Sequence, residues 1–278
     1  MDDVTTPDAP PDYGPYLPYR PPPPLPVPDP RKRRVLIAVT VVWALLLGVS
    51  AIWYSWHGRP TAREQTTIAS AEPTVTEAIQ AVVRTAGASV VPAFSGFEKV
   101  GDCAVTTVRS GMEYRRVLWL YTPVGSEPAL LDRLADGLPD RYAARTFHSP
   151  GGAVHTLSAD AGNFVMVSGT VLLPGLVRVR AETGCRTLGD LRSTDPTTTP
   201  GENPLGENPL GVAGSWRSHT LPCGLRTVMV TGPASRSFSA LPGTGLVVST
   251  PQVWAAKDGR AAHTESGQVT WTVTTGTC

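Results

Sequence analysis

The chain has little of what metal binding or nucleic-acid binding requires. Its 24 Lys and Arg nearly balance 23 Asp and Glu, and a formal net charge of +1 offers no basic surface for a nucleic acid. No Cys-x-x-Cys spacing occurs, which argues against paired zinc ligation. None of the five histidines stands at metal-ligand spacing from another: His57, His148, His155, His219 and His263. We therefore expect no metal site, no cofactor and no nucleic-acid partner.

Groups suited to catalysis are also scarce. His155, Ser158 and Asp160 have the residue types of a catalytic triad, but on a strand His155 and Ser158 would point to opposite faces. Glu98 and Glu113 lie near a predicted hairpin, yet no two carboxylates are placed for acid–base work. The glycines of 151–152 and 243–245 do not open a helix as a phosphate-binding loop does. The sequence predicts a protein that is not an enzyme and has no catalytic or cofactor-binding residue.

Lysine is nearly absent, since Lys32, Lys99 and Lys257 are the only three, and every other cation is arginine. Together with abundant Ala, Gly, Pro and Val, this composition indicates the coding bias of a GC-rich genome. It favours an actinobacterial source.

Residues 35–56 contain no Asp, Glu, Lys or Arg. As a helix rising about 1.5 Å per residue, this segment spans roughly 33 Å, enough for the hydrocarbon core of a bilayer. We expect a transmembrane anchor in the plasma membrane, with the N-terminus in the cytoplasm and the C-terminal region extracytoplasmic, because basic residues precede the span and aromatic residues close it. The residues that set this topology are Arg31, Lys32, Arg33, Arg34, Trp53, Tyr54 and Trp56.

A cleaved signal peptide is the alternative interpretation of this segment. Val49-Ser50-Ala51 offers small residues at an acceptable processing site. The region before the apolar stretch is long for a signal peptide, and the apolar stretch exceeds a typical signal core. Both lengths favour a retained anchor.

The N-terminal tail, residues 1–34, is dominated by proline. Such a segment cannot bury a core, and we expect it to be disordered with polyproline II character. Tyr13, Tyr16 and Tyr19 recur with the polyproline II period of three residues. Residues 20–26 resemble an SH3 ligand and residues 10–13 a WW ligand, so docking of a cytoplasmic partner is an alternative to a plain spacer.

The first exported region is predicted to be α+β. After a stalk at 57–72, we expect a domain at 73–186 with two helices packed on one face of a mostly antiparallel sheet. The first helix would begin with a capping box at Thr74 and Glu77 and stop at Gly87, and the second would begin near Ser126. The expected strands are 103–108, 114–121, 143–148, 153–158, 164–171 and 176–182.

Two further expectations concern this sheet. A hairpin turn is predicted at Ser110-Gly111, and residues 117–121 are apolar on both faces, which favours a central strand. In residues 176–182 apolar side chains alternate with Arg178, Arg180 and Glu182, a pattern that suits a sheet with one face in water.

Residues 187–215 are predicted to be a linker, because they are rich in Thr and Pro. Within it, the sequence of Gly201–Leu205 is repeated directly in Gly206–Leu210. Residues 216–278 are predicted to form a small β-rich module. Its clearest strands are 226–231, 246–249 and 269–274.

All four cysteines follow the apolar segment, and an even number of cysteines in an oxidising compartment predicts two disulfides. Sequence alone permits three connectivities. Cys185 and Cys278 each close a terminal strand, whereas Cys103 and Cys223 open the first strand of each module. We therefore predict the pairs Cys103–Cys185 and Cys223–Cys278, one for each module.

The layout resembles uncharacterised actinobacterial single-pass membrane proteins with a proline-rich cytoplasmic tail and a disulfide-bonded extracytoplasmic region. The resemblance rests on residues 21–30, 31–56, 101–103 and 183–185, and it implies location and architecture without an activity. We expect a membrane-anchored extracytoplasmic binding or scaffolding protein that contacts an envelope protein or the cell wall. An accessory or signalling subunit whose tail docks a cytoplasmic partner is the alternative, and an envelope hydrolase a more distant one.

Overall fold

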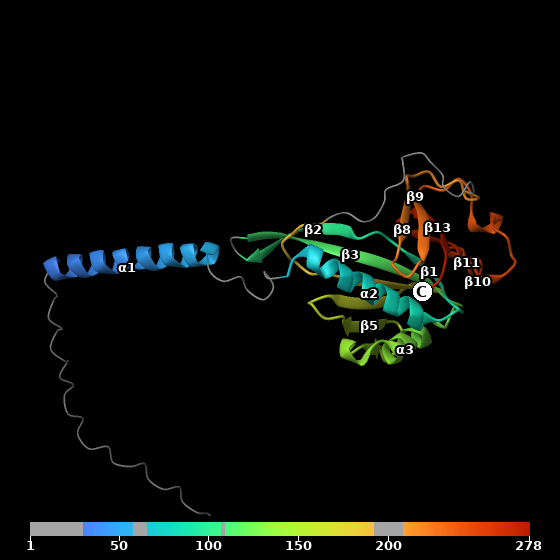
Figure 1. Cartoon of the computed structure of the whole chain (residues 1–278), viewed down its shortest axis with the longest axis horizontal. Helices are drawn as coiled ribbons and strands as arrows, with labels where there is room; N and C mark the ends of the chain where they lie inside the picture. Colours follow the sequence, from blue (N-terminus) through green and yellow to red (C-terminus); the bar gives the residue numbers. More distant parts are fainter. Residues whose placement is uncertain (1–29, 58–65, 107–108, 192–207) are drawn as a thin grey trace, which may run out of the picture. The chain divides into compact units, whose positions relative to one another are not determined.

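In the computed structural model, the described residues are 30–57, 66–106, 109–191 and 208–278. The chain divides into two compact units, Met1–Gly58 and Arg59–Cys278. The first contains helix α1 (Pro30–His57), and all other helices and strands belong to the second (Figure 1).

Helix α1 is apolar along most of its length. The segment Pro30–Trp53, with 24 residues, is the one candidate membrane span among the described residues, and none of it is buried. Arg31 to Arg34 occupy its first turns, and the side chain of Trp53 is exposed, whereas the side chains of Tyr54 and Trp56 lie outside the described set. With the two disulfides described below, this helix indicates an exported domain that is preceded by a signal or an anchor.

The second unit is α+β, as the sequence predicts, and is built on two antiparallel sheets. Sheet A contains β1 (Val91–Phe94), β2 (Glu98–Thr106), β3 (Arg109–Tyr121), β4 (Arg145–His148), β5 (His155–Asp160), β6 (Met166–Leu173) and β7 (Leu176–Glu182). Its strand order is β1-β3-β7-β6-β5-β4, and β2 pairs with β3.

Sheet B follows in the sequence. It contains β8 (Trp216–Thr220), β9 (Arg226–Gly232), β10 (Leu246–Ser249), β11 (Val253–Ala256), β12 (Arg260–Glu265) and β13 (Gln268–Thr275). Its strand order is β10-β11-β12-β13-β9-β8.

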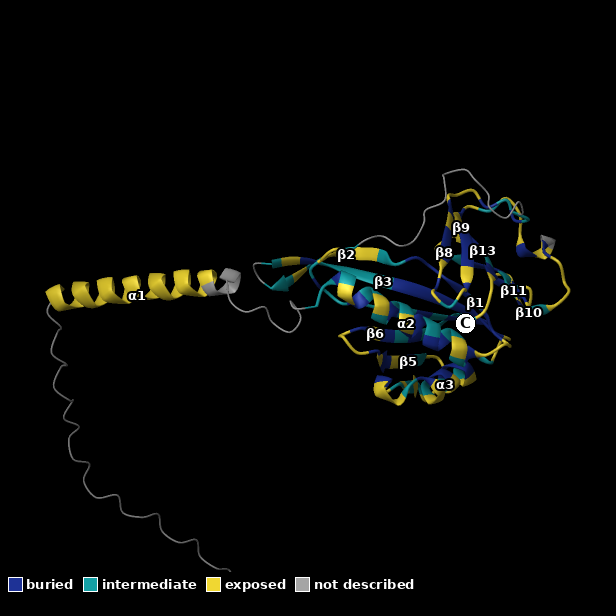
Figure 2. Cartoon of the chain, in the orientation of Figure 1, coloured by how far each residue is buried: buried dark blue, intermediate teal, exposed yellow. Residues whose placement is uncertain are grey.

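Helices α2 (Ile68–Ala86) and α3 (Glu127–Gly137) pack on one face of sheet A, and sheet B packs against part of the other face (Figures 1 and 2). Strand β3 shows how one sequence serves both layers. Leu118 and Leu120 belong to the core beneath the helices, while Val117, Trp119 and Tyr121 belong to the core shared with sheet B. The apolar run at 117–121 is therefore buried on both faces, as predicted.

Helix α2 begins earlier than the sequence predicts. Thr67 is its N-cap and accepts a hydrogen bond from Ser70 N at 3.2 Å, so the capping box predicted at Thr74 and Glu77 is wrong. Pro73 lies inside the helix. Because proline favours the first turn of a helix, its position in the sequence indicates a start later than the true one. Burial of the apolar face, which includes Ile68, compensates for the backbone hydrogen bond that proline cannot donate.

Helix α3 follows the prediction closely. Ser126 is its N-cap, Pro128 lies in its first turn, and the helix ends at Gly137. Its buried side chains include Leu130, Leu131 and Leu134, which face sheet A.

The turn predicted at Ser110-Gly111 is wrong, because both residues lie within β3. The β2–β3 connection falls at residues 107–108, outside the described set. Gly111 serves a close approach of two chain segments: a Cβ there would lie 2.6 Å from Arg186 O, and the neighbouring Met112 N donates to that carbonyl at 2.7 Å.

The face of β7 that carries Arg178, Arg180 and Glu182 is only partly in water, in contrast to the prediction. Strand β7 spans Leu176–Glu182 as expected, but its Arg178 side chain is only 19% exposed. It donates to Glu265 of sheet B at 2.5 Å. Sheet B therefore covers one end of the charged face of β7, which the sequence pattern predicts to be solvent-exposed.

The structure contains four strands that the sequence patterns miss: β1, β8, β11 and β12. Strands β11 and β12 are rich in alanine, a residue that is depleted in strands and gives a weak β signal. Ala255 and Ala261 are fully buried in the core shared by the two sheets.

The two disulfides have the predicted partners, Cys103–Cys185 and Cys223–Cys278, with Cα–Cα distances of 5.9 and 4.9 Å. Their positions differ from the expectation in part. Cys103 lies in the middle of β2, and Cys223 lies between β8 and β9 rather than at the start of a strand.

The two ends of the predicted linker pack against the fold. Thr187 O and Leu188 O accept hydrogen bonds from the first residues of α2, Ile68 N and Ala69 N. At the other end Leu210 is fully buried in the core of sheet B. Residues 192–207, which include most of the tandem repeat, lie outside the described set.

Candidate functional site

The two sheets meet over an apolar contact that Tyr121 and His263 complete. Tyr121 Oη lies 2.8 Å from His263 Nδ1, and both side chains are buried. Burial raises the pKa of Tyr121, so its hydroxyl stays protonated and shares a hydrogen bond with the ring. Burial, with a smaller contribution from Arg178, lowers the pKa of His263 to about 4, so the ring is neutral at pH 7.

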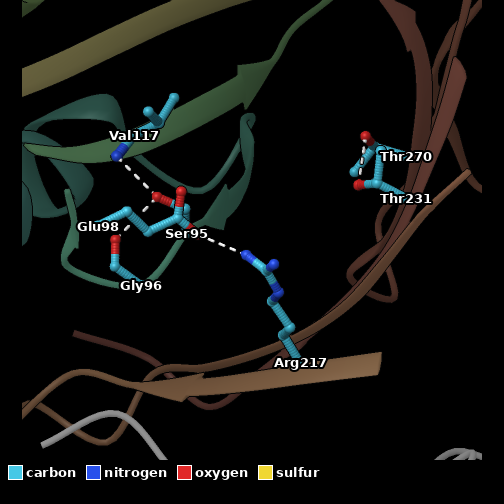
Figure 3. Close-up of polar contacts among 7 residues, drawn as sticks. All are labelled: Ser95, Gly96, Glu98, Val117, Arg217, Thr231 and Thr270. Atoms are coloured by element: carbon cyan, nitrogen blue, oxygen red, sulfur yellow. Dashed lines mark hydrogen bonds and ion pairs between the residues drawn. The ribbon is translucent and has the colours of Figure 1, made fainter. Parts of the chain in front are cut away.

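Beside this contact a cleft of about 490 Å³ opens between the sheets. Its sheet A wall comes from the β1–β2 connection and from β2 and β3, and consists of Ser95, Glu98, Arg115, Val117 and Trp119. The Ser95 hydroxyl already forms two hydrogen bonds within the protein: it accepts from Val117 N and donates to Gly96 O, each at 3.0 Å (Figure 3).

The sheet B wall consists of Ser215, Arg217, Met229, Thr231 and Gln268. The hydroxyl groups of Thr231 and Thr270 form a hydrogen bond of 2.9 Å that joins β9 to β13. The wall therefore mixes one apolar side chain with groups that form hydrogen bonds, and Ser215, Arg217, Thr231 and Gln268 are exposed.

Between residues that the structure describes, one ion pair crosses the cleft. Arg217 Nη1 lies 3.0 Å from a carboxylate oxygen of Glu98, so a cation of sheet B reaches an anion of sheet A (Figure 3). The two side chains are 55% and 40% exposed. Exposed pairs of this kind contribute about 0–1 kcal/mol, so a ligand that carries either charge can displace the pair at little cost.

Trp119 presents a hydrogen-bond donor without a partner. The residue is 9% exposed, and its Nε1 is buried and forms no hydrogen bond with any described residue. Buried donors are nearly always paired, and an unpaired one costs about 1–3 kcal/mol. An unsatisfied donor in a cleft wall is typical of a place where an acceptor from a ligand or water completes the structure.

A second polar cluster lies on the helix-covered side of sheet A. His148 of β4 and His155 of β5 are paired in register, with Nδ1 atoms 2.6 Å apart. His148 Nε2 lies 2.8 Å from Asp132 of α3, and His155 Nε2 lies 2.8 Å from Gly152 O. Hydrogen bonds from His148 and from Thr146 lower the pKa of Asp132.

The structure does not assemble a triad from His155, Ser158 and Asp160. His155 is turned toward His148, while Ser158 pairs with Ser168 of β6 on the opposite face, as strand alternation requires. Asp160 accepts a hydrogen bond from Gly162 N in the following turn. The His148–His155 contact, which joins residues seven apart across a hairpin, is a feature that spacing rules for single helices or loops overlook.

The other carboxylates, histidines and glycines that the sequence offers as candidate site residues lie at different places in the fold. Glu98 lies in the cleft, whereas Glu113 is on β3 away from it, in a pocket with Cys185. His219 is buried in β8, and the side chain of His57 lies outside the described residues. The glycines of 151–152 belong to the β4–β5 turn, and those of 243–245 precede β10.

No protein-family model, curated protein or solved structure matched the chain when each was searched.

Proposed function

We propose that the protein is a membrane-anchored extracytoplasmic binding or scaffolding protein of the cell envelope, and that the cleft between sheets A and B is its binding site. In this proposal α1 is retained as the anchor, the tail is cytoplasmic and the disulfide-bonded unit is outside. The basic residues 31–34 before the span and the aromatic residues after it support this orientation.

The observation that carries the proposal is the unpaired indole N–H of Trp119 in a cleft that is also lined by two cations, Arg115 and Arg217, and one anion, Glu98. The Nε1 atom is buried, so a partner that supplies an acceptor would pair this donor by displacing the side chains that cover it. Its charged groups would replace the weak Arg217–Glu98 pair with contacts shielded from water, where each contact is stronger.

The volume of the cleft limits what it can hold. About 490 Å³ lies within the range of sites for small ligands and single side chains, roughly 300–1,000 Å³. The walls are polar and several lining residues are exposed, which suits a short polar segment better than an apolar molecule. We therefore assign the cleft to a charged, hydrogen-bonding segment of an envelope protein or of the cell wall.

Site-specific crosslinking in intact cells tests this assignment. A photo-crosslinking residue at Gln268, an exposed position of the cleft, should capture an extracytoplasmic partner, and the same residue at Lys257, exposed on the β11–β12 turn, should not. Arg217→Glu places two like charges across the cleft and should abolish the crosslink at Gln268. Equal capture from both positions, or capture of cytosolic proteins, would contradict the proposal.

The proline-rich tail supports a second role, in which residues 1–30 dock a cytoplasmic partner. Deleting residues 2–30 while keeping Arg31 to Arg34 separates the two roles. If the exported unit alone provides function, the deletion leaves the crosslink at Gln268 and the cell phenotype unchanged. Loss of the phenotype with the crosslink intact would favour the accessory or signalling role.

A further inference from the structure

His148 and His155 face each other at the turn end of the β4–β5 hairpin. They are directly opposite in the β4–β5 register, and their ring centroids are 4.9 Å apart. The six residues between them form the turn, so the pairing of the strands itself brings the two rings together. Neither ring takes part in the intersheet cleft.

The outer nitrogen of each ring lies against an acceptor. His155 Nε2 is 2.8 Å from the carbonyl oxygen of Gly152, which has no proton to give. His148 Nε2 is 2.8 Å from a carboxylate oxygen of Asp132, and the same oxygen accepts from Thr146 Oγ1 at 2.8 Å. Both Nε2 atoms must therefore carry the ring proton and donate it.

When both rings are neutral, this assignment leaves their inner nitrogens without a proton. A neutral imidazole has one N–H and one lone pair, so with Nε2 protonated each Nδ1 presents its lone pair. The two Nδ1 atoms are 2.6 Å apart and point at one another. Two lone pairs at this distance repel, and the arrangement becomes favourable when a cation lies between them.

The surroundings have the form that metal-binding histidines use. A histidine ligand commonly donates its second N–H to a carboxylate or a backbone carbonyl, which orients the ring and increases its basicity. Asp132 does this for His148, and Gly152 O does it for His155. Both rings are therefore held with their Nδ1 lone pairs directed at one point.

We propose that His148 and His155 form a binding site for a divalent transition-metal ion such as Zn²⁺, with both rings coordinating through Nδ1. Imidazole nitrogen is a preferred ligand of zinc, copper and nickel. Zinc–nitrogen bonds of about 2.0–2.1 Å place two ligands of a tetrahedron roughly 3.3 Å apart, so the rings separate by less than about 1 Å on binding. Water completes the coordination, since the His148 side chain is 32% exposed.

The bound ion would fix the edge of sheet A. Among the described strands, β4 is the last of the sheet and pairs only with β5. Through the ion, His148 and His155 would join β4 to β5, and the contact of His148 with Asp132 joins β4 to α3. The site is separate from the cleft, so its test and that of the binding proposal succeed or fail independently.

Calorimetric titration of the full-length protein with ZnCl₂ tests the site. The protein is purified in detergent without a polyhistidine tag, treated with a chelator and kept oxidised. We expect one Zn²⁺ per chain. His148→Gln and His155→Gln should each abolish saturable binding, and Asp132→Asn should weaken it by about 10–100-fold through loss of ring orientation. Asp136→Asn, on the next turn of α3, is the matched control and should leave the affinity unchanged.

A second measurement on the unaltered chain does not depend on how the variants fold. In ¹⁵N spectra of the imidazole rings, Zn²⁺ should shift the Nδ1 resonances of two histidines while their Nε2 atoms remain protonated. Absence of Zn²⁺ binding would overturn the proposal and leave a proton as the shared cation. Binding that survives both histidine substitutions, or that shifts Nε2 in place of Nδ1, would overturn it as well.

Discussion

His263 links the stability of the second unit to pH. It lies in β12, is 1% exposed and forms a hydrogen bond with Tyr121 of sheet A. The charged groups near it are Arg178 of β7, which also lowers the pKa of His263, and Glu265 on its own strand, which binds Arg178. Protonation of the ring would place an unpaired charge in the core between the sheets.

The size of the effect follows from the two pKa values. The pKa of His263 is about 4 in the folded chain and 6.5 when unperturbed. The unfolded chain therefore binds more protons between these values, and stability falls as the pH decreases through this window. Between pH 7 and pH 5 the contribution of this residue to the free energy of unfolding falls by about 2 kcal/mol.

Denaturant unfolding at pH 7 and pH 5 measures this contribution. His263→Asn keeps an acceptor near Tyr121 and removes the titrating ring, so it should lose about 2 kcal/mol less than the unaltered chain over this interval. Tyr121→Phe keeps the buried ring and should retain the pH dependence. Equal losses in His263→Asn and the unaltered chain would refute the reasoning.

Substitutions at three further places test the packing of the second unit by equilibrium unfolding. Leu131→Ala removes a fully buried side chain between α3 and sheet A and should lower stability by about 2–5 kcal/mol, whereas a loss below 1 kcal/mol would contradict its place in the core. Glu127→Ala leaves Gly175 N without its buried acceptor and should cost about 1–3 kcal/mol, while Glu127→Gln should recover part of this loss. Replacing Cys223 and Cys278 by serine opens a loop with a sequence separation of 55 and should cost about 4 kcal/mol, and an unchanged midpoint would show that the bond is absent from the native chain.

Local patterns were sufficient for the features that depend on neighbouring residues. The apolar segment predicts α1, the leucine spacing and Pro128 predict α3, and strict alternation predicts β7 with its bounds. The disulfide pairs also follow the prediction, although Cys103 and Cys223 do not occupy the strand starts from which it was argued.

The candidate sites depend on contacts between distant segments, which local patterns do not reveal. The cleft lies between sheet A and strands β8, β9 and β13 of sheet B, and the sequence patterns miss β8, which places Arg217 in its wall. Charged residues such as Arg178 read as solvent-exposed, because nothing in β7 indicates that a second sheet covers them. The histidine pair needs the register of β4 and β5, and the predicted strands 143–148 and 153–158 place His148 opposite Ala153 instead of His155.

The binding proposal requires that residues 59–278 are exported as one disulfide-bonded unit. Peptide mapping without reduction, on protein isolated from the membranes of intact cells and alkylated at lysis, tests this most directly. We predict peptides that join Cys103 to Cys185 and Cys223 to Cys278, with no alkylated thiol. Four alkylated thiols, or a peptide that joins Cys103 to Cys223, would contradict it.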